Sequence, residues 1–411
     1  MAGGCRRDGS LFRCYEVRIK SSPSYRTPQA RSFHCGSTAQ CFGLPVGGGA
    51  GTLRHLMNPQ APAPEVVEQL IGRAERAGAS DIHVQMIGAG AQVAFRLDGL
   101  MTPALELPPD LAERVCGRIK YLAKLKTYQD ALPQDGRIER ADVHANCDLR
   151  VATYPTVTGE KIVLRLFHSA AVRTLRELGL APEVCGELEA FLRQTAGLLL
   201  LTGPAGSGKT TTIYGCLRFL AELGGRHIIT IEDPVEQIVP GVMQTEVNEA
   251  RGLTCATAAR HLLRQDPQVL VLGEIRDEET AGIAVRSALT GHLMIATLHA
   301  GSVTGVFERL FAMCPDRSAV ITTAALVLNQ RLLRRGCAAC AGRGCEACLG
   351  TGYRGRVPVV EWLKVTDTVR AGLRAQGPAA AEPGATLGRG ALALCAAGVT
   401  TQAEIHRVLG Q

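Results

Sequence analysis

The sequence predicts an α/β protein, in which a parallel-sheet core follows a smaller α+β domain. Three observations predict this class. The apolar run 198–201 ends in a glycine-rich loop that opens a helical stretch. Two later apolar runs, 227–231 and 268–272, each end in acidic residues. Residues 91–166 hold alternating, strand-like segments beside segments of helical spacing. Short apolar strands between helical stretches are typical of a parallel sheet covered by helices.

Length and composition narrow the class further. A chain of 411 residues is long enough for two or three domains. The formal net charge is +7, but residues 1–56 hold eight basic and two acidic residues, so the rest is nearly neutral. This balance does not indicate a basic folded surface for nucleic acid. No apolar run is long enough to cross a membrane, and the first residues lack the apolar core of a secretory signal.

The cysteines point to a reducing compartment. Their number, fifteen, is odd, and most of them stand singly along the chain. This pattern suits reduced thiols better than a disulfide framework, so we expect a cytoplasmic protein. Residues 1–56 are rich in Gly, Ser and Arg and show no periodicity. We expect a disordered leader, or an extension upstream of a start at Met57; a basic tail that touches a partner or anionic lipid is the alternative.

The region 57–168 is predicted to form the smaller α+β domain. Helical spacing begins at Pro64, and a second helix is expected from Asp110 to Leu125. Strand-like alternation covers 91–98, 147–153 and 161–166. Residues 169–195, with a helix from Pro182, are expected to be a linker into a nucleotide-binding core over 196–336.

The loop after the first apolar run has the spacing GxxxxGK[ST]. Its glycines let successive backbone N–H groups point at phosphate oxygens at the start of a helix. Lys209 adds a positive charge for the same oxygens, and the Thr210 hydroxyl is a magnesium ligand. The residues expected to bind nucleotide are Gly203, Pro204, Ala205, Gly206, Ser207, Gly208, Lys209, Thr210 and Thr211.

Two acidic residues and a histidine follow the phosphate loop, each at the end of a predicted strand. Glu232 follows the run 227–231, and Glu274 follows the run 268–272. A carboxylate at the end of a β-strand is what magnesium and the attacking water need beside a γ-phosphate. His299 ends a further short strand, where it can sense that phosphate.

These motifs carry a family resemblance. GPAGSGKTT, TIEDPVE, GEIRD and TGHLMIATLHA resemble the Walker A, Asp-box, Walker B and His-box motifs of the ATPases of type II secretion and type IV pilus assembly. SDIHV, FRLDG, PQDGR and LNQRLLRR extend the resemblance over about residues 65–408. The family implies a RecA-like core, ATP and Mg²⁺ as cofactors, and a homohexameric ring. In that ring the smaller domain packs on the nucleotide of its own or a neighbouring subunit.

The resemblance also implies roles for individual residues, by their positions in the matching motifs. Arg137, Arg150 and Arg165 match the arginines that this family presents to the phosphates. Glu274 is expected to hold water and Mg²⁺, and Glu232 to polarise the attacking water; which of the two is the general base stays open.

Some positions depart from the family pattern. Gln268 and Gln85 stand where members often have Asp and Glu, and Ala300 to Ser302 replace Thr-Asn-Asp. None of these changes removes a phosphate or metal group. Only residues 1–56 stand where many members carry a domain that docks on the membrane platform, so we expect this chain to lack that domain.

Residues 337–352 read CAACAGRGCEACLGTG, which is two copies of CxxCxGxG. Four thiolates in two such turns predict a tetrahedral zinc site made of Cys337, Cys340, Cys345 and Cys348. A redox CxxC is the alternative, but that chemistry needs one pair on a different kind of unit. The segment matches the tetracysteine module of the assembly ATPases, which retraction ATPases usually lack. A helical C-terminal subdomain is expected over 353–411.

The function expected from the resemblance is a motor. ATP hydrolysis in a cytoplasmic hexamer, peripheral to the inner membrane, would drive a platform protein there to assemble a pseudopilus or type IV pilus. No direct contact with nucleic acid is expected. The alternatives are a P-loop ATPase that translocates nucleic acid, the motor of a DNA-uptake pseudopilus, and a regulatory nucleotide-binding protein without turnover.

Overall fold

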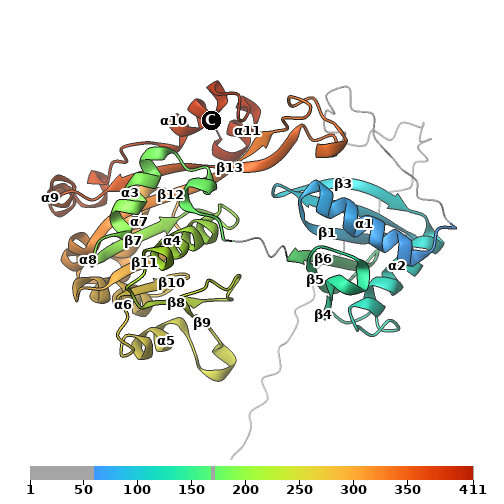
Figure 1. The fold of residues 1–411 in the computed structure, drawn as a ribbon, viewed down its shortest axis with the longest axis horizontal. Helices are drawn as coiled ribbons and strands as arrows, with labels where there is room; N and C mark the ends of the chain where they lie inside the picture. Colours follow the sequence, from blue (N-terminus) through green and yellow to red (C-terminus); the bar gives the residue numbers. More distant parts are fainter. Residues whose placement is uncertain (1–59, 168–171, 411) are drawn as a thin grey trace, which may run out of the picture. The chain divides into compact units, whose positions relative to one another are not determined.

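The computed structural model describes residues 60–167 and 172–410. The predicted leader, 1–56, and the first residues of the predicted linker lie outside the described residues. The described parts contain two sheets, of six and seven strands (Figure 1).

The six-stranded sheet is antiparallel throughout, in the order β3-β2-β1-β6-β5-β4. Helices α1 (Ala63–Ala77) and α2 (Pro109–Leu122) cover one of its faces (Figure 1). Their buried apolar residues form one core with the inward side chains of the strands. The strands are β1 (Ala79–Ile87), β2 (Gly90–Leu97), β3 (Leu100–Leu107), β4 (Gln134–Ile138), β5 (Asp148–Thr156) and β6 (Gly159–Phe167).

The α2 helix ends earlier than the sequence predicts. It stops at Leu122 rather than Leu125, because Lys124 adopts a left-handed backbone conformation with φ 60° that cannot continue a right-handed helix. The turn η1 (Arg140–Val143) is the remaining helical piece among the described residues of this region.

The seven-stranded sheet has the order β13-β12-β7-β11-β10-β8-β9. Its strands are parallel except for the edge pair of β12 and β13. Apolar cores lie on both faces, and the side chains of Leu198 to Leu201 alternate between them. This two-sided burial explains why the strands read as continuous apolar runs. The strands are β7 (Gly197–Thr202), β8 (Ile228–Glu232), β9 (Met243–Glu246), β10 (Val269–Leu272), β11 (Leu293–Leu298), β12 (Ala324–Gly336) and β13 (Tyr353–Lys364).

Helices cover both faces of this sheet (Figure 1). One core includes residues of η2 (Leu175–Leu178), α3 and α4, and the other includes residues of α5 to α9. The helices are α3 (Pro182–Leu192), α4 (Lys209–Leu223), α5 (Cys255–Leu262), α6 (Glu278–Leu289), α7 (Val303–Met313), α8 (Arg317–Thr323), α9 (Asp367–Gln376), α10 (Leu387–Ala396) and α11 (Gln402–Leu409), with the 3₁₀ turns η3 (Glu249–Arg251), η4 (Glu346–Cys348) and η5 (Gly377–Ala380).

The C-terminal segment differs from the helical subdomain expected over 353–411. It begins with β13, a strand of 12 residues that pairs with β12 and so belongs to the sheet. The helices α9, α10 and α11 follow it. The signal that marks this strand is its content of β-branched and aromatic residues, which include Val357, Val359, Val360 and Trp362. Within the described ranges, no helix is long and apolar enough to cross a membrane.

Candidate active site

Strand order places the predicted motifs at one edge of the seven-stranded sheet. β7, β11, β10 and β8 are neighbours and run parallel, so their carboxyl ends lie at the same edge. β7 delivers the phosphate loop, β11 delivers His299, β10 delivers Glu274, and β8 ends in Glu232. This edge is where open α/β sheets bind ligands.

The phosphate loop has the backbone that its glycines predict. Gly206 and Gly208 have φ values of 74° and 89°, in the left-handed region, and α4 begins at Lys209. The Lys209 ammonium donates hydrogen bonds to the carbonyls of Gly203 and Pro204, over 2.8 and 3.0 Å. Burial lowers the pKa of Lys209, and the nearby Glu274 carboxylate acts against that shift. A cationic group and the first N–H groups of a helix therefore converge at this loop.

Gln330, which the sequence motifs did not indicate, supports this loop through hydrogen bonds. Gln330, on β12, is 2% exposed. Its amide donates to the carbonyl of Ser207 over 2.8 Å, and its oxygen accepts from the Thr212 hydroxyl over 2.9 Å. A Cβ on Gly208 would lie 2.7 Å from Nε2 of Gln330, so the Gln330 amide would have to shift, and the φ of 89° also favours glycine. Gln330 therefore fixes both the loop and the first turn of α4.

Glu274 lies at the centre of a charged cluster. Its Oε1 is 2.7 Å from Nε2 of His299, and its Oε2 accepts from Nε of Arg276 over 2.7 Å. Nδ1 of His299 lies 3.3 Å from the carbonyl oxygen of Gly203, which brings the histidine to the phosphate loop. A second nitrogen of Arg276 donates to Asp233 over 3.1 Å. The Glu274 side chain stays 24% exposed, so an oxygen of this carboxylate can meet solvent or substrate.

Glu232 has a different environment. It is 8% exposed, and both of its oxygens accept hydrogen bonds from neighbouring side chains. The hydroxyl of Tyr214 donates to one oxygen, and the hydroxyl of Thr230 and the amide of Gln244 donate to the other. The two predicted carboxylates thus differ in access, which their positions after two apolar runs did not indicate.

The three predicted arginines lie together on the six-stranded sheet. Strand register pairs Arg137 with Arg150 and Arg150 with Arg165, so the three form one row across β4, β5 and β6. The row continues through Asp81 on β1 to Arg96 on β2. Asp81 is 2.9 Å from Nε of Arg165 and 3.3 Å from Nε of Arg96. Sequence reasoning missed these last two residues, because only the register shows their place in the row.

Arg137 forms an ion pair with Asp148, and Arg150 lies over the ring of Phe167. Desolvation by burial would raise the pKa of Asp81, but the hydrogen bond from Arg165, together with the other partners, outweighs this effect and lowers it. The row therefore carries four arginines, three of which pair with the buried Asp81 or the half-buried Asp148.

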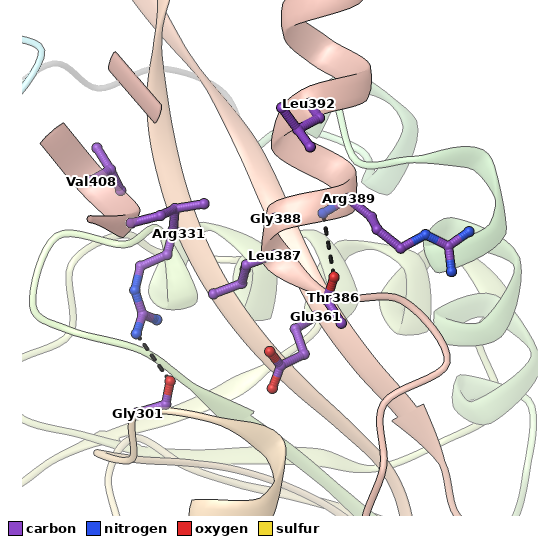
Figure 2. A pocket seen from close by; sticks show the side chains of 10 residues that line it. Gly301, Arg331, Glu361, Thr386, Leu387, Gly388, Arg389, Leu392 and Val408 are labelled. Atoms are coloured by element: carbon purple, nitrogen blue, oxygen red, sulfur yellow. Dashed lines mark hydrogen bonds between the residues drawn. The ribbon is translucent and has the colours of Figure 1, made fainter. Parts of the chain in front are cut away.

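A pocket of about 560 Å³ adjoins the loop that follows His299 (Figure 2). Arg331 points from β12 to the carbonyl of Gly301, to which it donates over 3.2 Å. Glu361, Leu387 and Leu392 also line the pocket. None of the predicted site residues lines it.

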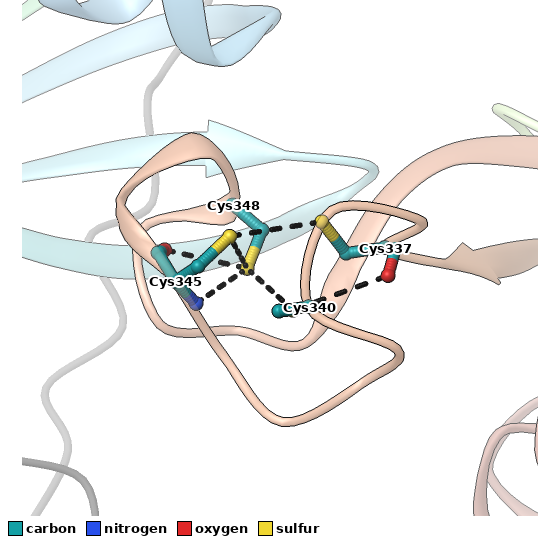
Figure 3. Close-up of side chains that lie close together, drawn as sticks. All are labelled: Cys337, Cys340, Cys345 and Cys348. Atoms are coloured by element: carbon teal, nitrogen blue, oxygen red, sulfur yellow. Dashed lines mark hydrogen bonds between the residues drawn. The ribbon is translucent and has the colours of Figure 1, made fainter.

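The four predicted metal ligands do come together, in the segment between β12 and β13 (Figure 3). Their sulfur atoms all lie within 4.8 Å of one another. The Sγ–Sγ distance is 3.9 Å between Cys337 and Cys345, 3.9 Å between Cys340 and Cys348, and 3.7 Å between Cys345 and Cys348. A tetrahedron with zinc–sulfur bonds of about 2.3 Å has edges of about 3.8 Å, so the four thiols fit such an ion.

The backbone of this module also favours thiolates. The N–H groups of Gly344 and Cys345 donate to the sulfurs of Cys340 and Cys348, each over 3.2 Å. Burial would raise the pKa of Cys348, but hydrogen bonds from the backbone and from neighbouring thiols outweigh it and lower the pKa to about 6. The two CxxCxGxG copies interlock through their glycines. A Cβ on Gly344 would lie 2.7 Å from the carbonyl oxygen of Gly350, and one on Gly352 would lie 2.4 Å from that of Gly342.

A phosphate loop, an acid after β10 and a histidine after β11, all at one edge of a mainly parallel sheet, define a P-loop ATPase. The comparisons with known proteins give the family. Residues 57–407 match the family described as Type II/IV secretion system protein, and the chain belongs to this family. The predicted fold class and family are confirmed.

Relatives with curated names support the same assignment. Type II secretion system protein HxcR of Pseudomonas aeruginosa is 39% identical over 319 residues, which cover 75% of this chain and 68% of the relative. Type II secretion system protein E of the same species is 42% identical, covering 68% and 56%. Type IV pilus assembly ATPase PilB of Thermus thermophilus is 37% identical, covering 76% and 38%. The chain thus spans from about two fifths to about two thirds of these relatives.

Solved structures agree with the fold. The pilus retraction motor PilT with bound ADP is 27% identical, with a TM-score of 0.59, and the match covers 85% of this chain and 97% of PilT. The ATPase DotB of Legionella pneumophila has a TM-score of 0.66 at 21% identity, covering 85% of this chain and 96% of DotB. At that identity DotB supports the fold alone.

Proposed function

We propose that this chain is the ATP-hydrolysing motor of a machine that assembles a type II secretion pseudopilus or a type IV pilus. It works as a homohexamer in the cytoplasm, held at the inner membrane by a platform protein. The observation that carries the proposal is the position of Glu274, which contacts His299 and interacts electrostatically with Lys209 of the phosphate loop. The names of the relatives support the choice of machine.

In this proposal, the backbone N–H groups and Lys209 of the phosphate loop bind the β- and γ-phosphates. Thr210 and Glu274 are the groups that fit a magnesium ion, whose charge would offset that of the phosphates. Glu274 orients the attacking water, and His299 reports on the γ-phosphate. Arg137, Arg150 and Arg165 supply positive charge to the transferring phosphoryl group, from the same or a neighbouring subunit. The four cysteines hold a structural zinc ion.

The test is steady-state ATP hydrolysis by the full chain beside Glu274→Gln, with native mass and zinc content measured on the same samples. We expect a hexamer with about one zinc ion per chain, and a variant that binds ATP without turning it over. Glu308→Gln, an exposed change on α7, is the matched control and should keep full activity.

Other results would point to other functions. A wild-type chain that binds ATP but never hydrolyses it, even when assembled, would indicate a regulatory protein. Hydrolysis stimulated by DNA would indicate nucleic-acid translocation. Sedimentation with inner membranes only when the platform protein is present tests the proposed location, and sedimentation without that protein would contradict it.

A further inference from the structure

The hydroxyl of Tyr214 joins the helix of the phosphate loop to the loop that follows β8. Tyr214 lies on α4, five residues after Lys209, and is 5% exposed. Its hydroxyl donates to the Glu232 carboxylate. The same oxygen accepts from the backbone N–H groups of Glu236 and Gln237, each over 3.1 Å. One hydroxyl thus uses its donor and both lone pairs inside the protein.

Both carboxylate oxygens of Glu232 accept hydrogen bonds in this arrangement. Its second oxygen accepts from the Thr230 hydroxyl and from the Gln244 amide, the latter over 3.0 Å. A carboxylate that is 8% exposed and bound by three donors has little capacity left to accept a proton from water. Glu274 is the more exposed of the two acids, with 24% of its side chain accessible.

The loop held by Tyr214 leads to the charged cluster of the active site. Asp233 follows Glu232 directly and accepts a hydrogen bond from Arg276. Arg276 also donates to Glu274, over 2.7 Å. The loop 233–237 therefore fixes one of the two groups that orient the Glu274 carboxylate. Removing the Tyr214 hydroxyl deletes two hydrogen bonds of this loop, while the bonds from Val235 to Glu246 and from Gln244 to Gln237 remain. No group that the proposed function assigns to substrate is removed.

We propose that Tyr214 is a positioning residue for ATP hydrolysis: its hydroxyl holds Glu232 and the loop 233–237, and thereby sets Asp233 and Arg276 against Glu274. Glu232 is then a buried acceptor that shapes the loop, and Glu274 is the general base. This inference rests on the proposed ATPase function, which gives Glu274 its role.

The first measurement does not depend on activity. Tyr214→Phe keeps the ring and removes the hydroxyl, so the backbone amides of Glu236 and Gln237 lose their acceptor. We expect hydrogen exchange of the peptide covering 233–237 to speed up roughly tenfold in the full chain. The matched control is Leu217→Val, a buried change on the same helix that leaves the hydroxyl in place. Unchanged exchange in Tyr214→Phe, or equal acceleration in the control, overturns the proposal.

The second measurement separates positioning from general destabilisation. For Tyr214→Phe we expect kcat to fall about tenfold while KM for ATP stays within about twofold, because the phosphate loop keeps its own contacts. Leu217→Val should leave both values near those of the wild type. A rise in KM with unchanged kcat would show that Tyr214 serves nucleotide binding, and would overturn the proposal.

Comparison of the two acids completes the test. Glu232→Gln should slow kcat to about the same degree as Tyr214→Phe, and the double variant should be no slower than either one, because both act through one contact. Glu274→Gln should lose at least about a hundredfold. Equal loss in Glu232→Gln and Glu274→Gln would make Glu232 a catalytic residue and contradict the proposal. A wild type that hydrolyses no ATP would refute the proposed function, while the exchange result would still decide whether Tyr214 holds the loop.

Discussion

Nε2 of His299 lies 2.7 Å from Oε1 of Glu274, and Nδ1 of the same ring lies 3.3 Å from the carbonyl oxygen of Gly203. One imidazole therefore links the acid that follows β10 to the first glycine of the phosphate loop. This link makes His299 sensitive to both parts of the site. A shift of the loop on nucleotide binding would be felt at Glu274 through a single side chain.

The first prediction concerns this histidine. His299→Ala removes one of the two side chains that hold Glu274, and a hydrogen bond to a charged group contributes about 1.5–3 kcal/mol. We expect kcat for ATP hydrolysis to fall about 10- to 100-fold, with ATP binding largely retained. His292→Ala is the control, since the ring of His292 bonds to Ser287 at the end of α6 and to Thr290 in the following turn. Steady-state kinetics and equilibrium nucleotide binding measure both effects, and a loss of binding alone would contradict the prediction.

The second prediction concerns the support of the phosphate loop. Gln330→Leu keeps the approximate volume but leaves the Ser207 carbonyl without its donor and the Thr212 hydroxyl without its acceptor. Each buried group left unpaired costs about 1–3 kcal/mol. We expect ATP affinity to weaken roughly tenfold and the melting temperature to fall. Gln92→Leu, an exposed change on β2, should alter neither. Isothermal titration with a non-hydrolysable ATP analogue tests this, and unchanged affinity would exclude a role for Gln330 in shaping the loop.

The third prediction concerns the metal module. Gly352→Ala places a Cβ 2.4 Å from the carbonyl oxygen of Gly342, so the two cysteine turns must move apart. Gly350→Ala is a closely matched control, because both glycines have φ 77° but a Cβ at Gly350 meets no atom within 4 Å. We expect Gly352→Ala to lose zinc to a chelator at least tenfold faster than the control. Zinc release is followed with a colorimetric zinc indicator. Equal rates in the two variants would mean that backbone strain at a positive φ, and not the close approach to Gly342, sets the rate of zinc loss.

Sequence patterns predicted the parts of the site that depend on local spacing. The phosphate loop, Glu274, His299 and the four cysteines were found because a fixed spacing or a strand end determines where they lie. Contacts between distant segments could not be found this way. Gln330 is 123 residues from Ser207, and nothing in LNQRLLRR distinguishes a loop support from a strand residue.

Two further cases show the same limit. A single tyrosine on a helix with buried apolar residues, such as Tyr214, reads as a core residue until its hydroxyl is seen to meet Glu232. Asp81 lies 84 residues before Arg165, and only strand register joins them. In the C-terminal segment, the prediction of a helical subdomain missed β13. The strand with which β13 pairs, β12, is separated from it in sequence by the cysteine module.

The last prediction concerns stability at acid pH. Glu404, on α11, is fully buried, and its oxygens accept hydrogen bonds from the side chains of Arg334 and Arg407. Burial would raise the pKa of Glu404, but these hydrogen bonds outweigh it and lower the pKa from its ordinary value of 4.5 to about 2. Because the folded-state value is the lower one, the carboxylate stabilises the fold above pH 4.5, and this stabilisation is lost as the pH falls towards 2.

Glu404→Gln should therefore show its largest effect near neutral pH. Leaving Arg334 and Arg407 without a carboxylate costs about 3–5 kcal/mol there. The difference in unfolding free energy between wild type and variant should shrink by about 3 kcal/mol between pH 5 and pH 2. Loss of metal in acid affects both proteins alike, so it drops out of this difference. Glu106→Gln, an exposed change on β3, should show no such trend. Denaturant unfolding at a series of pH values measures this difference in free energy. A difference that stays constant down to pH 2 would show that the ionised Glu404 carboxylate does not stabilise the packing of α11.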